Sequence, residues 1–354
     1  MIRFFRRRRA AVAMLAAAAV TVVGLGSVPA GAQDSGEVKV TGSSTVEPIA
    51  GLVAELFAEE NPDVQIEVQG PGSSDGYELF CSTEPGQWDG TNGSRAMDED
   101  EAAECDANGI EFTELLVGID GLTIVANKES PLKCLDQQQI YAIFGPESEG
   151  GETDLADAQA LAEELGSTNK PLPDGTVEKF TPGTESGTYG SFIEINYEDL
   201  MEERLAAGDI PADRVGDEDG EAVVTEPVVS SATFPNDNDI VNRVTGSDDG
   251  IGFFGFSYFT ANKGDLKAVK IYNEDEGKCV KPTAKTIEGG TYPISRPLFT
   301  YPNHASIADK PAVKGFYDSW INEDALTELT IEAGYVPAAK DQREETISAY
   351  EAIG

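Results

Sequence analysis

One local pattern recurs along this 354-residue chain: a β-branched run leads into a loop rich in Gly, Ser and Thr, and then into a helix. Its clearest copies are TGSSTVEP at residues 41–48, QGPGSSDGY at 69–77 and PGTESGTYGSF at 182–192. Repeated strand–loop–helix units are typical of an α/β fold with mostly parallel sheets. The length exceeds that of one compact unit, so we expect two lobes or domains.

Hydrophobic spacing predicts the elements around these loops. Ile49, Val53 and Phe57 recur at helical spacing after the first loop, and the pair Asn61-Pro62 ends that helix. The other predictions are a pair of strands over residues 110–128, a short helix over 135–145, exposed loops over 147–175 and 207–223, a buried aromatic strand over 251–259, and the last helices over 315–336.

The first 32 residues have the pattern of an export signal. A basic start, MIRFFRRRRA, precedes an apolar segment that ends in an Ala-x-Ala pattern. We predict a signal peptide over residues 1–32, cleaved near Ala32-Gln33, and hence a secreted protein of the periplasm or cell envelope. A retained membrane anchor is the less favoured alternative, because the apolar run is short and rich in small residues.

Acidic residues dominate the composition. The chain has 64 Asp and Glu residues against 25 Lys and Arg residues, a formal net charge of −39. Such a charge disfavours binding to nucleic acid, and no nucleic-acid partner is expected.

Four cysteines, an even number in a secreted chain, predict two disulfides. Three pairings are possible, and pairing Cys81 with its neighbour Cys105 leaves Cys134 with Cys279. A zinc site is the weaker alternative, because the spacings are wide and His304 is the only histidine. We therefore expect no metal and no cofactor.

The three Gly-rich loops have the chemistry of an anion site. The first N–H groups of a helix lack partners within the helix, and the macrodipole places partial positive charge there. Glycine allows close approach of an oxyanion, and hydroxyls add donors. A single such loop is more simply an N-cap, but three of them at the carboxyl ends of strands favour one site for a phosphate-like anion.

Two charged residues are candidates beside these loops. Arg95 follows Ser94 in a Gly/Asn-rich turn, and its guanidinium either forks onto the anion or forms a surface ion pair with Asp98 or Glu99. Asp237 lies in a turn before a helix, where capping is the default explanation. A carboxylate facing the site would accept the proton of monohydrogen phosphate and repel sulfate, which has no such proton.

Motifs from one end of the mature chain to the other resemble a known family. The motifs VTGSSTVEPIA, EVQGPGSSDGYELFC, GSRAMDEDEAAEC, FTPGTESGTYGSF, IGFFGFSYF, YPISRPLF and AGYVP are similar, in this order, to those of the PstS-type phosphate-binding proteins of phosphate ABC transporters. The resemblance implies a two-lobed periplasmic-binding-protein-like (type II) fold. Each lobe would be a mixed, mostly parallel sheet flanked by helices, and a two-strand hinge would join the lobes around a phosphate ion.

The resemblance also implies roles for single residues. Ser44 and Thr45 match the first phosphate loop, Ser73 matches the second, and the run Ser186, Gly187 and Thr188 matches the Ser-Gly-Thr of the second lobe. The chain departs from the family pattern at two places: Pro182 stands where many members have an Arg, and Arg95 follows Ser94 where some members have an Asp. Arg95 is therefore the expected cation of the site, and Asp237 the expected proton acceptor.

Lobe boundaries follow from the same comparison. Residues 33–122 and 293–354 would form lobe one, and residues 123–292 lobe two. Each pair of the nearest-neighbour disulfide assignment would then lie within one lobe, which leaves the hinge free to move.

The leading functional hypothesis is a non-enzymatic, monomeric receptor that delivers inorganic phosphate to a membrane ABC permease. A secreted phosphoester hydrolase is one alternative, but it would need an activated nucleophile or a metal centre. A receptor for another tetrahedral oxyanion, such as sulfate, is the other.

Overall fold

The computed structural model describes residues 36–82, 88–218 and 220–354. The predicted signal peptide lies outside the described residues. Within the described ranges, none of the helices combines the length and the apolar character needed to cross a bilayer.

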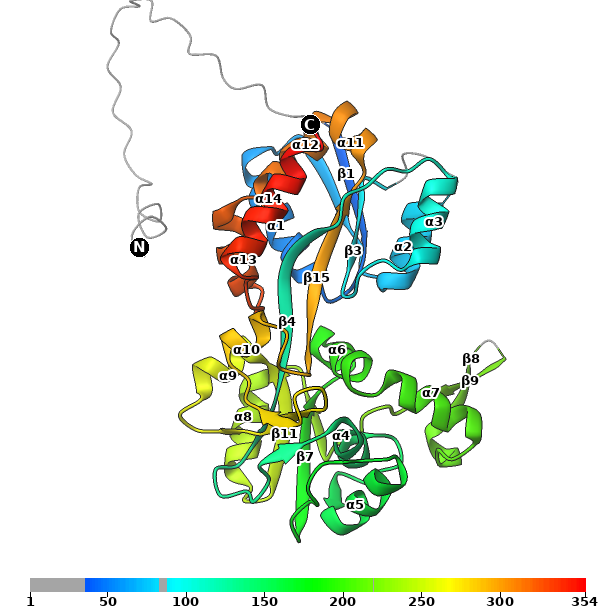
Figure 1. Cartoon of the computed structure of the whole chain (residues 1–354), viewed down its shortest axis with the longest axis vertical. Helices are drawn as coiled ribbons and strands as arrows, with labels where there is room; N and C mark the ends of the chain where they lie inside the picture. Colours follow the sequence, from blue (N-terminus) through cyan, green and yellow to red (C-terminus); the bar gives the residue numbers. More distant parts are fainter. Residues whose placement is uncertain (1–35, 83–87, 219) are drawn as a thin grey trace, which may run out of the picture. The chain divides into compact units, whose positions relative to one another are not determined.

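The largest sheet has the strand order β10-β7-β11-β4-β15-β3-β1-β2 (Figure 1). Its long central strand, β4 (Leu115–Ala126), pairs with β15 up to Gly121 and with β11 from Leu122 onward, antiparallel in both cases. One strand thus belongs to two groups of strands. We call the group that contains β1, β2, β3 and β15 lobe one, and the group that contains β7, β10 and β11 lobe two.

Lobe one surrounds its strands with helices from both ends of the chain. Its elements are β1 (Gly36–Gly42), α1 (Glu47–Glu60), β2 (Val64–Val68), α2 (Ser73–Cys81), β3 (Gly90–Gly93), α3 (Glu99–Ala107), β15 (Ser295–Pro302), α11 (His304–Asp309), α12 (Pro311–Trp320), α13 (Glu323–Glu332) and α14 (Lys340–Glu351).

Lobe two is built from the middle of the chain. Its elements are β5 (Cys134–Leu135), α4 (Gln137–Phe144), β6 (Glu152–Asp154), α5 (Leu155–Glu164), β7 (Thr176–Pro182), α6 (Gly187–Asn196), α7 (Glu198–Ala207), η1 (Ala212–Arg214), β8 (Val215–Glu218), β9 (Glu221–Val224), β10 (Ala232–Phe234), α8 (Asp237–Gly246), β11 (Gly250–Gly255), α9 (Phe256–Asn262), β12 (Lys267–Ala268), β13 (Lys270–Asn273), β14 (Lys278–Val280) and α10 (Ala284–Glu288).

Each lobe has its own hydrophobic core. In lobe one, α1 buries Ile49, Val53 and Phe57 on one face against α12 and α13, as the helical spacing predicts. In lobe two, the rings of Phe192 and Phe253 stack with their centroids 3.7 Å apart and join α6 to β11. Two separate cores allow the lobes to move as units about the strands that connect them.

Four local predictions need correction. Residues 110–128 contain one long strand, β4, because its nearly continuous apolar run is buried on both faces. The run at 251–259 is strand β11 followed by helix α9. The expected loop at 147–175 contains α5, which buries Leu155, Ala158 and Ala162, and the expected loop at 207–223 contains strand β8 and most of its hairpin partner β9.

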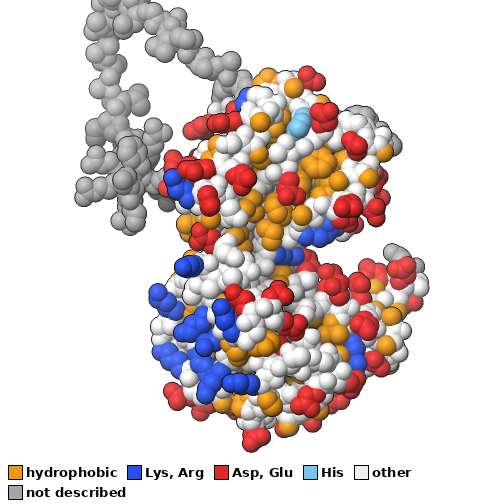
Figure 2. Space-filling model, viewed as in Figure 1, with side chains coloured by type: hydrophobic (Ala, Val, Ile, Leu, Met, Phe, Trp, Pro, Cys, Tyr) orange, Lys and Arg blue, Asp and Glu red, His pale blue; other side chains and the backbone are white. Residues whose placement is uncertain are grey.

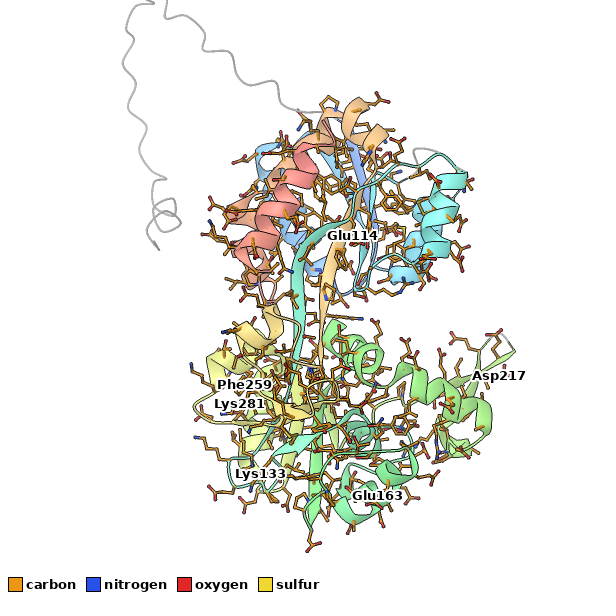
Figure 3. All side chains as sticks on the ribbon, in the orientation of Figure 1. Glu114, Lys133, Glu163, Asp217, Phe259 and Lys281 are labelled. Atoms are coloured by element: carbon orange, nitrogen blue, oxygen red, sulfur yellow. A yellow bond between two sulfur atoms is a disulfide. The ribbon has the colours of Figure 1, made fainter. Side chains whose placement is uncertain are left out.

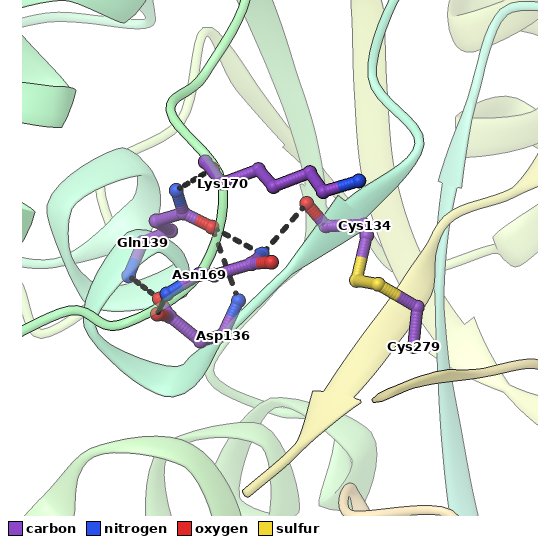
Figure 4. The surroundings of a disulfide bond; sticks show 6 residues. All are labelled: Cys134, Asp136, Gln139, Asn169, Lys170 and Cys279. Carbon is purple, nitrogen blue, oxygen red and sulfur yellow. Dashed lines mark hydrogen bonds between the residues drawn. A yellow bond between two sulfur atoms is a disulfide. The ribbon is translucent and has the colours of Figure 1, made fainter. Parts of the chain in front are cut away.

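The disulfide prediction is confirmed. Cys81 bonds Cys105 and ties α2 to α3 in lobe one. Cys134 bonds Cys279 and ties β5 to β14 in lobe two (Figure 4). Neither bond crosses between the lobes, as the expected hinge motion requires.

A third segment accompanies β4 and β15 where the lobes join. Val336 exchanges backbone hydrogen bonds with Ile119 of β4, at 2.8 and 2.9 Å. The hydroxyl of Ser257, at the start of α9, donates to the Gly334 carbonyl at 2.6 Å. The segment before α14 therefore contacts both lobes.

Candidate anion-binding site

The candidate loops of lobe one meet at one edge of its sheet. Strands β2 and β3 both run parallel to β1, so the loops after all three strands lie at the same end. Gly42, at the end of β1, has φ +118° and packs directly against Asn92 of β3 and Gly76 of α2. A side chain at either glycine would collide with backbone, so this close packing of two loops depends on glycine.

Ser73 and Ser94 form a direct pair at this edge. Their hydroxyl oxygens lie 3.1 Å apart, and the Ser94 N–H donates to the Ser73 hydroxyl, also at 3.1 Å. Ser73 opens α2 and Ser94 follows β3, so the structure brings two of the predicted loops into contact.

Arg95 lies in the same loop as Ser94, and its guanidinium pairs with a carboxylate. Its two terminal nitrogens donate to the two oxygens of Glu101, at 2.8 and 2.5 Å, and one of them also donates to the Ser74 hydroxyl at 2.9 Å. The expected surface partners, Asp98 and Glu99, are therefore not the partners found. The reason is local, because Glu101 also accepts from the Asp98 N–H as part of the capping box of α3.

The candidate loops of lobe two share the corresponding edge of the second group of strands. Strand β10 runs parallel to β7, with Phe234 opposite Pro182, so the helices that follow these strands begin at the same edge of the sheet. Ser186 caps α6 by accepting from the Thr188 N–H at 3.2 Å. Asp237 is the first residue of α8, is half-buried, and has its pKa raised by that burial.

The first turn of α6 reaches the first loop of lobe one. A Cβ atom on Gly187 would lie 3.9 Å from the Ser44 carbonyl oxygen. The Thr45 hydroxyl lies 3.1 Å from that of Ser191, one turn further along α6. The Ser-Gly-Thr run of lobe two and the Ser-Ser-Thr run of lobe one are therefore neighbours.

An arginine that was not predicted from the sequence lies at this junction. Arg296 of β15 donates from one nitrogen to the hydroxyls of Thr45 at 2.9 Å and Ser191 at 3.0 Å. Its other terminal nitrogen pairs with Glu194. The guanidinium thus contacts both lobes. The signal available was the motif YPISRPLF, which places an arginine within a strand.

A buried carboxyl group lies beside this arginine. Asp120 of β4 is the cross-strand neighbour of Arg296, and its carboxylate is 3.9 Å from the Arg296 Nε atom. Its side chain is almost fully buried, and one oxygen has no hydrogen-bond partner within the described residues. Burial raises the pKa of Asp120, while the Arg296 charge opposes that shift.

The nine candidate residues therefore fall into three groups. Ser44, Thr45 and the turn formed by Ser186, Gly187 and Thr188 meet across the lobes; Ser73, Ser94 and Arg95 cluster in lobe one; and Asp237 stands apart. Within the described ranges, no hydrogen bond or ion pair joins Asp237 to the other candidates.

A cavity of about 830 Å³ beside Arg296 and Pro297 is lined by α10 and the start of α14, not by the candidate loops.

Comparison with known proteins agrees with this architecture. The model of the PBP superfamily domain matches residues 27–322. SphX of Synechococcus elongatus is 32% identical over 301 residues, which cover 85% of this chain and 77% of that protein. The phosphate-binding protein PstS of Staphylococcus saprophyticus is 32% identical over 284 residues, which cover 80% and 74% respectively.

Solved structures show the same fold. A possible phosphate-binding protein from Planctomyces limnophilus matches with a TM-score of 0.74 and 32% identity, over 90% of this chain and 99% of that one. An ABC-type phosphate transport receptor from Vibrio cholerae matches with a TM-score of 0.56 over 85% of this chain and 99% of that one; at 24% identity this likeness shows the fold alone. The expectation of a two-lobed α/β fold is confirmed. The chain belongs to the PBP superfamily and, within it, to the family of the phosphate-binding proteins PstS.

Proposed function

We propose that this protein is an extracytoplasmic receptor that binds inorganic phosphate and delivers it to a membrane ABC permease. The observation that carries the proposal is the meeting of two helix-opening loops from different lobes, with Ser44 beside Gly187 and Thr45 beside Ser191. Backbone N–H groups and hydroxyls from both lobes are suited to surround one tetrahedral anion when the lobes close.

The proposal assigns roles to the predicted residues. Arg95 supplies the cation, exchanging Glu101 for two phosphate oxygens. Asp237 accepts the phosphate proton, and its raised pKa suits a proton acceptor. The hydroxyl and backbone donors are Ser44, Thr45, Ser73, Ser94, Ser186, Gly187 and Thr188.

The names of the relatives support phosphate as the ligand. The Staphylococcus relative is a phosphate-binding protein, and the Planctomyces protein is a possible one. The proposal includes lobe boundaries at 33–122 plus 293–354 and at 123–292, export through the signal peptide at residues 1–32, and action as a monomer. The switch of β4 from β15 to β11 after Gly121 supports the first of these boundaries.

Calorimetric titration of the mature chain tests the ligand. We expect saturable phosphate binding at neutral pH, with sulfate much weaker because Asp237 repels an anion that has no proton to donate. Preference for sulfate would overturn the choice of ligand. Replacing Asp237 with Asn should reduce the discrimination between the two anions, whereas replacing Asp239, the other acid in the first turn of α8, should leave it unchanged.

A phosphoester hydrolase remains the alternative of another class. The chain's single histidine, His304, bonds the Thr113 hydroxyl at 2.9 Å in lobe one and is not in contact with Ser186. Incubation with a chromogenic phosphate ester separates the two functions. Turnover by the wild type that is lost in Ser186→Ala would show that the protein is an enzyme and would overturn the receptor proposal.

A further inference from the structure

One face of lobe two has a composition unlike that of the rest of the chain. Eight of the fourteen lysines come from two short segments, residues 128–133 and 263–285. Figure 2 shows Lys and Arg side chains gathered on this part of lobe two, and Figure 3 labels two of its lysines, Lys133 and Lys281. We call this set the lysine face: Lys128, Lys133, Lys263, Lys267, Lys270, Lys278, Lys281 and Lys285.

Most of these charges are free of carboxylate partners. Six of the eight side chains are exposed, and Lys267 and Lys270 are half-buried. Within the described residues, Lys278 is the only one of the eight in an ion pair, with Glu276. Burial lowers the pKa of Lys267, and repulsion by Lys133 adds to that shift while Glu129 opposes it, so Lys133 and Lys267 lie near each other.

Five carboxylates come from the same two segments. Glu129 and Asp265 lie among the lysines in sequence, and the other three, residues 274–276, form the turn between β13 and β14. Glu274 and Asp275 line a cavity of about 420 Å³ together with Gln137 of α4 and Ile195 of α6. Two carboxylates of that turn therefore face this cavity, while Glu276 pairs with Lys278. Eight lysines against five carboxylates leave the two segments with a net charge of +3.

Two of the lysines, Lys270 and Lys278, lie in strands that are firmly held, and Lys133 directly precedes a third such strand. Strands β5, β13 and β14 form one small sheet, which the Cys134–Cys279 disulfide closes. Figure 4 shows a network behind it, in which Asn169 donates to the Cys134 carbonyl at 3.2 Å and to Gln139 at 2.9 Å. Lys133 and Lys278 directly precede the bonded cysteines, so their spacing is fixed. A fixed array of charges needs less ordering when it meets a partner.

We propose that the lysine face is a docking surface for the anionic phosphate headgroups of a phospholipid bilayer. Lysine is a strongly hydrated point charge, suited to many diffuse phosphate contacts, and the face contains no arginine for forked pairing. The large hydrophobic side chains most exposed among the described residues, Leu56, Leu79 and Ile331, all belong to lobe one. The face thus lacks the apolar or aromatic anchors that dominate tight protein interfaces.

The acidity of the whole chain does not prevent this contact. At physiological ionic strength the Debye length is about 8 Å, so a bilayer senses mainly the charges that face it. The same acidity orients the protein, because any other face brought to the membrane is repelled. This inference goes beyond phosphate binding and does not depend on it.

Vesicle sedimentation tests the proposal with the mature chain. Wild-type protein should sediment with vesicles of phosphatidylcholine mixed with phosphatidylglycerol but not with pure phosphatidylcholine vesicles, and added salt should release it. The variant Lys133→Gln/Lys270→Gln/Lys281→Gln removes three lysines whose ammonium groups make no hydrogen bond or ion pair within the described residues. We expect its partition coefficient to fall by about a hundredfold.

The matched control changes the net charge equally on lobe one. Lys39→Gln/Lys314→Gln/Lys340→Gln should not weaken vesicle binding, and circular dichroism of both variants reports whether they are folded. Equal loss in both triple variants, no loss in the lysine-face variant, or no preference of the wild type for anionic vesicles would each overturn the proposal. So would displacement from vesicles by an acidic peptide at low concentration, which would indicate a protein partner.

Discussion

Two arginines near the candidate loops differ in almost every physical respect. Arg95 has a side chain that is 42% exposed and holds a carboxylate from the next helix, Glu101. Arg296 has a side chain that is 14% exposed and contacts Thr45 of one lobe and Ser191 and Glu194 of the other. Arg95 can release Glu101 at little cost, whereas loss of Arg296 would leave the buried carboxylate of Asp120 without its opposing charge.

This difference indicates that Arg95 is suited to binding a ligand and Arg296 to stabilising the protein. An exchangeable cation is suited to a ligand that must arrive and depart, and a fixed cation between the lobes is suited to holding the loops of the two lobes in place. Arg296 uses one nitrogen to orient two hydroxyls, and the Thr45 carbonyl accepts in addition from the Tyr335 hydroxyl at 2.7 Å. Thr45 is therefore held in place by Arg296, Ser191 and Tyr335.

The largest effect is expected from Arg296→Met. Loss of the guanidinium leaves Asp120 buried without its opposing charge, which should reduce the free energy of unfolding by about 3 kcal/mol at neutral pH. Denaturant unfolding measures the loss, with Lys314→Met, which removes an exposed ion pair with Asp318, as the control. A change no larger than that of the control would contradict the framework role of Arg296.

The same variant has a defined pH dependence. Burial raises the pKa of Asp120, so the folded state holds this proton more tightly than the unfolded state. Protonation removes the uncompensated charge, and the destabilisation by Arg296→Met should shrink as the pH falls through the folded-state pKa of Asp120. A loss independent of pH would indicate that packing, not charge, is responsible.

Arg95→Ala should show the opposite profile. Phosphate affinity should weaken by about 2 kcal/mol, because a charged donor to the anion is lost. The free energy of unfolding should change by about 1 kcal/mol, because the Arg95 side chain is 42% exposed even though that of Glu101 is only 18% exposed. Calorimetry and unfolding on one preparation measure both. Unchanged affinity would place Arg95 among ordinary surface residues.

The fold was largely predictable because its signals are local. Ile49, Val53 and Phe57 define α1 without any tertiary information, and the strand–loop–helix order indicates parallel strands. The helix α9 was missed because Phe256 and Phe259 continue an aromatic run whose period is ambiguous over so few residues. Proximity in the sequence suggested the correct disulfide pairing, and the resemblance to the family supported it.

The site was less accessible from sequence. The loops were visible from their glycines, but the Arg296 contact with Thr45 joins residues 251 positions apart. For the alternative in which Arg95 forms a surface ion pair, Asp98 or Glu99 was the expected partner, because a turn before an acidic helix does not reveal which carboxylate the arginine reaches. Asp98 caps the helix, and this leaves Glu101 on the side of the arginine.

Lys179 is a third basic residue near the core and, unlike Arg95 and Arg296, it forms no ion pair within the described residues. It is fully buried in β7 and donates to the Ile143 carbonyl at 2.9 Å and to the Ser148 hydroxyl at 2.5 Å. Burial lowers the pKa of Lys179 to about 7, from the ordinary lysine value of 10.5, so above pH 7 the unfolded state binds more protons. Stability attributable to Lys179 should therefore rise between these pH values, by about 1 kcal/mol per pH unit.

Lys179→Met should remove that alkaline rise and leave the rest of the pH profile intact. Unfolding at several pH values between 7 and 10 measures the slope, and Lys170→Met, an exposed lysine before the same strand, is the control. An unchanged slope would mean that Lys179 remains charged in the fold, as Arg296 does.

The smallest expected effect comes from Glu101→Gln, which should increase the affinity for phosphate. Glu101→Gln removes the carboxylate that competes with phosphate for Arg95, whereas glutamine can still accept from the Asp98 N–H and preserve the capping box. We expect phosphate to bind about threefold more tightly, since an exposed ion pair contributes less than about 1 kcal/mol. Glu104→Gln makes the same charge change on the exposed side of α3 and should have little effect. If both variants tightened binding equally, the gain would come from the net charge of the lobe, and Arg95 would not be the residue that exchanges its partner for the ligand.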